Sequence, residues 1–358
     1  MTEPPIPPEA PPPEEMTLRP PGEFRREQYD TDAALELFEN LLLAAARIPV
    51  EDDPATHPLV LVQAAKALVG LRPHEPSRRL IDFALDRCPE LPPERPVGDL
   101  KIPLERLGTT VAVFELEDAV ESGDLPAARE QLGRLLLVSD NKPFAFDILL
   151  ALAARQPANV PALVPLVHYC LRAAQFVGAG HVADFLLPAL DALVAASSSS
   201  SGSGSGSGSS SSSGRGKHER KSPGREFGSV WEALPYLGEA PLEALTLAAH
   251  GAQIAADEHV KQGSIQRGIL GALGSNWQLA VGKPRRTGHG EPGSGGGRGS
   301  TGDRGWLLEE LEQASEITIG LLLWADNFRM LYRTAAEEHY PLLKELAEAR
   351  LAALANEK

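Results

Sequence analysis

One apolar segment, LVPLVHYCLRAAQFVGAGHVADFLLPALDAL at 163–193, carries the side chains best suited to chemistry. His168, Tyr169 and Cys170 are consecutive, and His181 follows a Gly-Ala-Gly step. A thiol near an imidazole is typical of a cysteine nucleophile. Neighbouring residues of a helix point about 100° apart, however, so His168 cannot activate Cys170 within one helix. We interpret Cys170 as a small buried side chain and keep His168, Tyr169 and His181 as candidates for lining a pocket.

Histidine is also a common metal ligand. Helical di-iron sites use Glu-x-x-His and zinc hydrolases use His-Glu-x-x-His, because these spacings put ligands on one helix face. Neither spacing occurs here. A site for iron or zinc would have to be assembled from several helices, with His168, His250 and His259 as nitrogen donors and Glu258 or Asp257 as oxygen donors. Isolated helical histidines usually have local hydrogen-bond partners, so we predict no cofactor and keep His250 as a further pocket candidate.

The sequence offers no dinucleotide-binding loop. GHGEPG at 288–293 has the Gly-x-Gly-x-x-Gly spacing, but no strand precedes it and no helix follows. It therefore lacks the helix N-terminus that would hold a pyrophosphate. The two cysteines, Cys88 and Cys170, form no CxxC pair, which excludes a disulfide framework or a cysteine metal cluster.

Helical periodicity is the pattern that must position these side chains. YDTDAALELFENLLLAAARI offers Asp30 or Thr31 as an N-cap, and SGDLPAAREQ offers Asp124 followed by Pro126 in the first turn. Alternation typical of strands is missing. The sequence predicts an all-α fold built from helices joined by short turns.

Two of the helical pairs resemble one another. VQAAKALVGLRPHEPSRRLIDFALD, which starts at Val62, aligns without a gap on VHYCLRAAQFVGAGHVADFLLPALD, which starts at Val167. This similarity predicts stacked antiparallel helical hairpins in an irregular repeat. Gln63 stands where His168 stands, so the architecture does not require histidine there.

Low-complexity segments interrupt this pattern. SSSSSGSGSGSGSSSSSGRG and a second Gly-rich stretch have the composition of flexible coils, and proline runs mark the N-terminus. We expect one helical body with disordered insertions. Its parts are a disordered Pro-rich tail at 1–28, a helical-repeat region at 29–196, a disordered Ser/Gly-rich basic loop at 197–228, a helical hairpin at 229–281, a disordered Gly-rich loop at 282–305 and C-terminal helices at 306–358.

The C-terminal region has an aromatic stripe. We expect one periodic helix there, followed by a last helix that begins at Pro341. We interpret the stripe as core. Its members follow spacings that are mostly three and four: Trp306, Ile317, Leu321, Trp324, Phe328 and Leu331.

Composition limits the function classes. The net charge is −15 and the pI is about 5.1, which argues against binding to DNA or to an anionic membrane surface. ITIGLLLWA at 317–325 is about half as long as a bilayer-spanning helix. The N-terminus lacks the basic and apolar regions of a signal peptide. We therefore expect a cytoplasmic protein that does not span a membrane.

Basic residues cluster in the low-complexity segments. Residues 214–225 and 282–305 are rich in arginine and glycine, a composition that could contact RNA. Neither segment has an aromatic side chain for base stacking, so weak RNA binding is the third hypothesis below.

Three helical segments carry a resemblance to a known family. SGDLPAAREQLGRLLL, LVHYCLRAAQFVGAGHVADFLLPAL and LTLAAHGAQIAADEHV are similar to the all-helical domains of questin-oxidase-like proteins and to the helical regions attached to some Rieske proteins. The resemblance implies oxygenation of a polycyclic or aromatic metabolite, with the histidines of these segments near a pocket. No Rieske Cys-His motif occurs, and no catalytic residue is carried over.

Two hypotheses from different classes therefore lead. The first is a helical-repeat scaffold without catalytic activity that contacts a protein partner or a second copy of itself. The alternative is an all-helical, questin-oxidase-like oxidoreductase. Stoichiometric iron or zinc that is lost on His168→Ala or His250→Ala would favour the alternative.

Overall fold

A computed structural model describes residues 18–51, 53–88, 90, 113–139, 142–201, 226–238, 240–257, 262–277 and 305–356. Within these ranges the elements are α-helices and short 3-10 turns, and no strand occurs. The expected all-α fold is confirmed. Residues 1–17 of the tail predicted at 1–28 and most of the two low-complexity loops lie outside the described residues, as do His259 and Glu258. The described part of that tail is not coil throughout, because Pro21–Phe24 forms a 3-10 turn and Phe24 is buried in the core.

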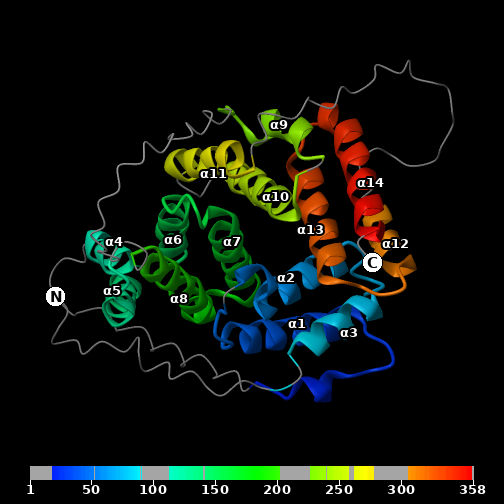
Figure 1. The fold of residues 1–358 in the computed structure, drawn as a ribbon. Coiled ribbons are helices and arrows are strands. Elements are labelled where there is room, and N and C mark those ends of the chain that lie inside the picture. Colours follow the sequence, from blue (N-terminus) through cyan, green and yellow to red (C-terminus); the bar gives the residue numbers. More distant parts are fainter. Residues whose placement is uncertain are drawn as a thin grey trace, which may run out of the picture.

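The helices pair along the chain (Figure 1). In order they are α1 (Thr31–Ala46), α2 (Pro58–Val69), α3 (Arg78–Arg87), α4 (Val113–Glu121), α5 (Leu125–Val138), α6 (Phe144–Ala154), α7 (Val160–Val177), α8 (Val182–Ser201), α9 (Val230–Ala233), α10 (Leu242–Ala256), α11 (Gln262–Asn276), α12 (Gly305–Gln313), α13 (Ile319–Thr334) and α14 (Tyr340–Asn356).

Local chemistry sets several of these boundaries. The carboxylate of Asp30 accepts from the Ala33 backbone N–H at the start of α1, and Asp124 does the same for Ala127 at the start of α5. Gly178 ends α7 with a φ of +113°, a conformation that other residues rarely adopt. The caps at Asp30 and Asp124 are where the sequence predicts them.

Four helices from distant parts of the chain close a ring. α2 packs on α7, α7 on α10, α10 on α13, and α13 on α2. The similar sequence segments at 62–86 and 167–191 form the α2–α3 and α7–α8 hairpins, so each hairpin gives its first helix to the ring. The ring positions the site described below.

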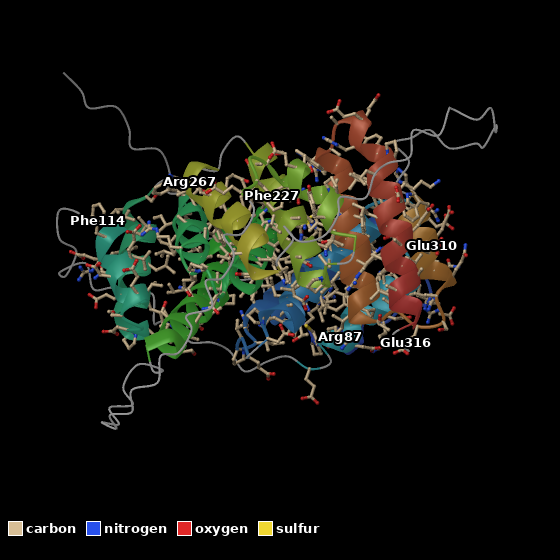
Figure 2. All side chains as sticks on the ribbon, turned by 45° about the horizontal axis from the view of Figure 1, so that its top comes forward. Arg87, Phe114, Phe227, Arg267, Glu310 and Glu316 are labelled. Carbon is tan, nitrogen blue, oxygen red and sulfur yellow. The ribbon has the colours of Figure 1, made fainter. Side chains whose placement is uncertain are left out.

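Large apolar side chains fill the spaces between helices (Figure 2). Trp324 is fully buried, and its indole N–H donates to the Ala347 carbonyl over 3.1 Å. The rest of the predicted stripe is buried as well, which confirms its interpretation as core, except that Trp306 is only partly buried. Both cysteines are also buried and unpaired.

The structure corrects two predicted boundaries. The C-terminal stripe forms two helices, because Thr318 caps a new start at Ile319 with its hydroxyl accepting from the Leu321 N–H. Trp306 and Trp324 then meet across the two helices with ring centroids 6.0 Å apart. α8 also continues through Ser201, past the predicted loop start at 197, with Ser197 and Ser198 hydroxyls donating to carbonyls one turn earlier.

Two helical stretches are long and apolar enough to cross a membrane by length and composition, Val160–Val177 and Ala179–Ser199. More than half of the apolar stretch is buried inside the helical body in both cases, 67% in the first and 56% in the second. Core helices of soluble proteins have the same property, so this observation does not assign a location.

Candidate functional site

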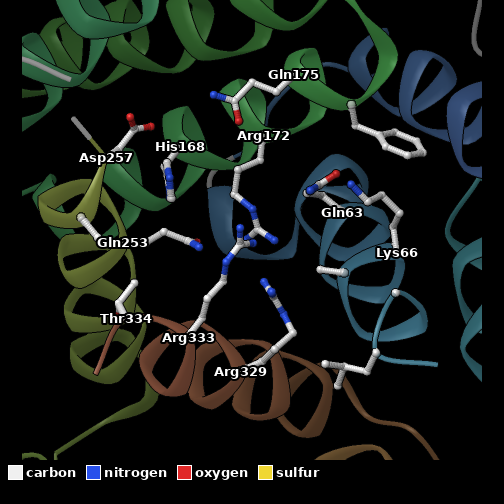
Figure 3. Close-up of a pocket in the computed structure, with 15 residues that line it drawn as sticks. Gln63, Lys66, His168, Arg172, Gln175, Gln253, Asp257, Arg329, Arg333 and Thr334 are labelled. Atoms are coloured by element: carbon white, nitrogen blue, oxygen red, sulfur yellow. The ribbon is translucent and has the colours of Figure 1, made fainter. Parts of the chain in front are cut away.

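A cavity of about 1020 Å³ opens between the four helices of the ring. Each helix forms one wall: α2 contributes Gln63 and Lys66, α7 contributes His168 and Arg172, and α10 contributes Gln253, while α13 supplies Arg329 and Arg333 (Figure 3). Polar side chains thus converge on one space from segments far apart in the sequence.

Helical spacing explains why these residues share a wall. On α2, Lys66 and Ala67 follow Gln63 by three and four residues, and the C-cap Gly70 follows them by four and three, so these residues lie on one face. On α7, His168 and Arg172 are one turn apart, as are Arg329 and Arg333 on α13. Gln63 and His168, equivalent in the two similar hairpins, both face the cavity.

Two of the arginines are anchored by a buried carboxylate. Asp326 has no exposed surface; Arg329 Nε donates to its Oδ1 over 2.7 Å, and Arg172 lies 3.5 Å from its Oδ2. The Tyr169 hydroxyl also donates to Oδ2, over 2.9 Å. Burial on its own would raise the pKa of Asp326, but the two guanidinium groups hold that pKa below its ordinary value. Asp326 is therefore an ionised anchor.

The carboxylate of Asp326 does not by itself neutralise the cations of this cavity. Figure 3 shows the guanidinium groups of Arg172, Arg329 and Arg333 directed toward its centre. Among the described residues, Arg333 and Lys66 make no ion pair with a carboxylate, and Asp257 is the only acidic side chain lining the cavity. The site carries a local excess of positive charge in a chain with a net charge of −15.

The amine of Lys66 has an unusual environment. Its Nζ lies 3.8 Å from the centroid of the Phe176 ring, a cation–π contact. Burial, followed by repulsion from Arg172 and Arg329, lowers the pKa of Lys66 to about 7. About half of these amines are thus neutral near pH 7.

Two histidines share a hydrogen bond, His168 at the cavity wall and His250 behind it. Nδ1 of His168 lies 2.7 Å from Nδ1 of His250, and the His250 ring also packs edge-on against Tyr169. Burial and then the positive charge of Arg172 lower the pKa of His168 to about 3, and burial lowers the pKa of His250 well below its ordinary value. Both rings are neutral at pH 7.

Several polar atoms of this region have no protein partner within the described chain. They include a terminal nitrogen of Arg329, the Oε1 atoms of Gln63 and Gln253, and Nε2 of His250. A buried donor or acceptor without a partner costs about 1–3 kcal/mol. Gln63, Gln253 and Arg329 line the cavity, whereas His250 lies behind its wall, and the four atoms themselves are buried.

The predicted site residues do not all line the cavity. His168, Tyr169 and His250 come together, and of these only His168 lines the cavity. His181 lies in the 3-10 turn after α7, where its Nδ1 is 3.2 Å from Asp184 Oδ2, and it does not line the cavity. Among the described residues no three potential metal-ligating side chains gather; His259 and Glu258 lie outside those residues.

The buried thiols are poor nucleophiles. Burial raises the pKa of Cys170 above its usual value and raises the pKa of Cys88 to about 12. This agrees with the interpretation of Cys170 as a small core side chain.

Sequence reasoning missed the cationic residues. Lys66, Arg172, Arg329 and Asp326 interrupt otherwise apolar helical faces, and Asp326 and Arg329 are three residues apart within WADNFRM. Charged residues inside a core stripe are rarely buried without a partner. That rule could have singled out this set before the structure was known.

Comparison of the chain with protein-family models, with curated proteins and with solved structures found no match.

Proposed function

We propose that this protein binds a small anionic molecule in the cavity between α2, α7, α10 and α13. The observation that carries the proposal is the convergence of Arg172, Arg329, Arg333 and Lys66 on one cavity, where Asp257 is the only acidic lining residue among those that the structure describes. Concentrated positive charge is costly to hold without a counter-charge, and an anionic ligand supplies one.

The form of the cations favours carboxylate or phosphate. Guanidinium groups offer planar pairs of N–H donors that match the oxygens of either anion. Asp326 fixes two of these groups before any ligand arrives, which lowers the entropy lost on binding.

The remaining walls restrict the ligand further. Phe176, Leu71 and Ala67 supply apolar surface beside the cationic groups. The volume of about 1020 Å³ is at the upper end of small-molecule sites. A metabolite with an anionic group and a carbon skeleton suits this lining better than a bare inorganic ion.

Isothermal titration calorimetry with citrate and with inorganic phosphate tests this proposal. Arg333→Gln removes an exposed cation at the rim and should weaken binding about tenfold, as expected when a hydrogen bond to a charged group is lost. Arg78→Gln is the matched control, because Arg78 lies on the exposed face of α3. Absence of binding heat with both anions, or equal affinity in wild type and Arg333→Gln, would contradict the proposal.

Oxidation of a neutral polycyclic substrate stays a prediction from the resemblance. The cavity supports it less well, because its cations offer a neutral aromatic skeleton little beyond cation–π contacts.

Self-association is a second candidate function, favoured by a separate observation. Three large apolar side chains are exposed at one end of the α4–α5 hairpin: Phe114 (74%), Leu137 (53%) and Val138 (55%). Phe114 lies at the outer margin of the molecule (Figure 2). We propose that a second copy of the chain covers this patch, since exposed apolar clusters mark contact surfaces.

Sedimentation equilibrium tests the second candidate. Wild type should form dimers that Phe114→Ser/Leu137→Ser dissociates, whereas Leu35→Ser, a change at the exposed Leu35 on α1, should leave them intact. A monomeric wild type would rule this candidate out.

A further inference from the structure

We infer that Lys66 is a reactive amine that forms an imine with a carbonyl group of the anionic ligand. The inference rests on the proposed function, because the arginines hold the anionic end of the ligand while Lys66 meets its carbonyl carbon. The ligand class is an oxo compound with a carboxylate or phosphate group a few bonds from the carbonyl.

The position of Lys66 supports this role. Its side chain lies on the α2 wall, while Arg172, Arg329 and Arg333 approach from α7 and α13 (Figure 3). An anionic group bound to the guanidinium cluster would leave the rest of the ligand beside α2. Both requirements of the reaction, an amine and an anion anchor, are therefore met in one cavity.

The surroundings of Lys66 also favour reaction over charge pairing. Most lysines near a protein interior pair with a carboxylate, but the described residues provide none in contact with this amine. Phe176 covers one side of Nζ, and nearby guanidinium groups disfavour its protonated form. Lysines in apolar pockets or beside other cations are activated in this way.

The reaction balances without any further reagent. The lone pair of neutral Nζ forms a bond to the carbonyl carbon, and the carbonyl oxygen takes up a proton. The nitrogen supplies this proton and then gives up its second proton as the carbon–oxygen bond breaks, so the oxygen leaves as water and a C=N bond replaces the C=O bond. Protonation of the imine nitrogen restores a positive charge beside the ligand's anionic group.

Borohydride trapping on the full chain tests the inference. The protein is incubated near pH 7 with pyruvate or, separately, with pyridoxal 5′-phosphate, reduced, and digested for peptide mass spectrometry. Hydride adds to the imine carbon and fixes the adduct as a secondary amine. Lys66 should be labelled at least about tenfold more than the exposed Lys344, because neutral amine is far more abundant at a lysine with a lowered pKa.

Matched probes and variants sharpen this experiment. Pyruvate and pyridoxal phosphate distinguish a carboxylate from a phosphate ligand, and pyridoxal without its phosphate should label Lys66 about tenfold less, the loss expected for one charged contact. Lys66→Arg keeps the positive charge and removes the nucleophile, so it should give no adduct at this position. Lys66→Met serves as a second variant if Lys66→Arg does not fold, and Lys344→Arg should behave as wild type.

The outcomes separate this inference from the proposed function. Anion binding by calorimetry without preferential labelling of Lys66 overturns the imine and leaves anion binding in place. Equal labelling by pyridoxal and pyridoxal phosphate overturns the role of the anion anchor. Failure of both calorimetry and trapping overturns both proposals.

Discussion

The Nδ1 atoms of His168 and His250 lie 2.7 Å apart across the contact between α7 and α10. Because one nitrogen must donate a proton and the other must accept it, at most one of the two rings can be protonated while the bond is intact. The pair therefore joins two walls of the cavity only as long as it stays neutral or shares a single added proton.

Acidification should destabilise the protein through this pair. The pKa of His168 is lowered from 6.5 to about 3 and that of His250 is lowered in the same direction, so the unfolded chain binds more protons. The contribution of the neutral pair to the free energy of unfolding is fully present above pH 6.5. Below that pH it should fall by about 2–3 kcal/mol per pH unit for the two rings together. Urea denaturation from about pH 7 to about pH 5 measures this slope.

His168→Gln/His250→Gln should flatten the slope, whereas His181→Gln should preserve it. Asp326 affects stability only at lower pH. A carboxyl group with a lowered pKa loses its contribution to folding stability only below its ordinary pKa of 3.8. An unchanged slope in the double variant would show that other groups cause the acid sensitivity.

Asp326→Asn should destabilise the fold strongly. It leaves Arg172 and Arg329 in a largely buried place without their counter-charge, and breaking such a pair costs about 3–5 kcal/mol. Asp191→Asn is the comparison, because the Arg129–Asp191 pair is more exposed and should be worth about 1 kcal/mol. Chemical denaturation of both variants measures the difference, and equal losses would refute the anchoring role of Asp326.

Two glycines of α11 should respond in opposite directions to alanine. A Cβ at Gly268 would lie 2.8 Å from the Ala154 Cβ of α6, so Gly268→Ala should push the helices apart and cost about 1–3 kcal/mol. A Cβ at Gly271 meets nothing within 4 Å, so Gly271→Ala should stabilise the helix by about 0.5–1 kcal/mol. Thermal unfolding of the two variants tests the α6–α11 contact, which would be disproved by a stabilising Gly268→Ala.

Lys66→Met should stabilise the protein near pH 7. The pKa of Lys66 falls from 10.5 to about 7 on folding, so the unfolded chain binds more protons between these values and wild-type stability should rise with pH across that window. After allowance for partial solvent contact, the rise should be about 1–2 kcal/mol. Lys66→Met should lack this rise in stability with pH, and Lys344→Met should retain the rise. Denaturation midpoints at both ends of the window give the measurement, and a flat wild-type profile would argue against a protonation cost at Lys66.

Much of the fold could be predicted from local patterns. The caps at Asp30 and Asp124, the helix break at Gly178 and the similarity of the α2–α3 and α7–α8 hairpins follow from preferences of a few consecutive residues. The division of the C-terminal stripe into α12 and α13 was missed, because the apolar spacing continues across the break that Thr318 caps.

The site, in contrast, is formed by contacts between residues that are far apart in the sequence. Sequence spacing placed His168 on a helix face and Asp326 and Arg329 within one turn of each other, and it offered Tyr169 and His250 as pocket candidates. It could not show that Arg172 meets Asp326, 154 positions away. Helical periodicity reveals which face of a helix is buried, but not which other helix covers that face. Only the closure of α2, α7, α10 and α13 into a ring decided that Lys66 and the arginines share one cavity, because burial and opposing charges become defined when those faces meet.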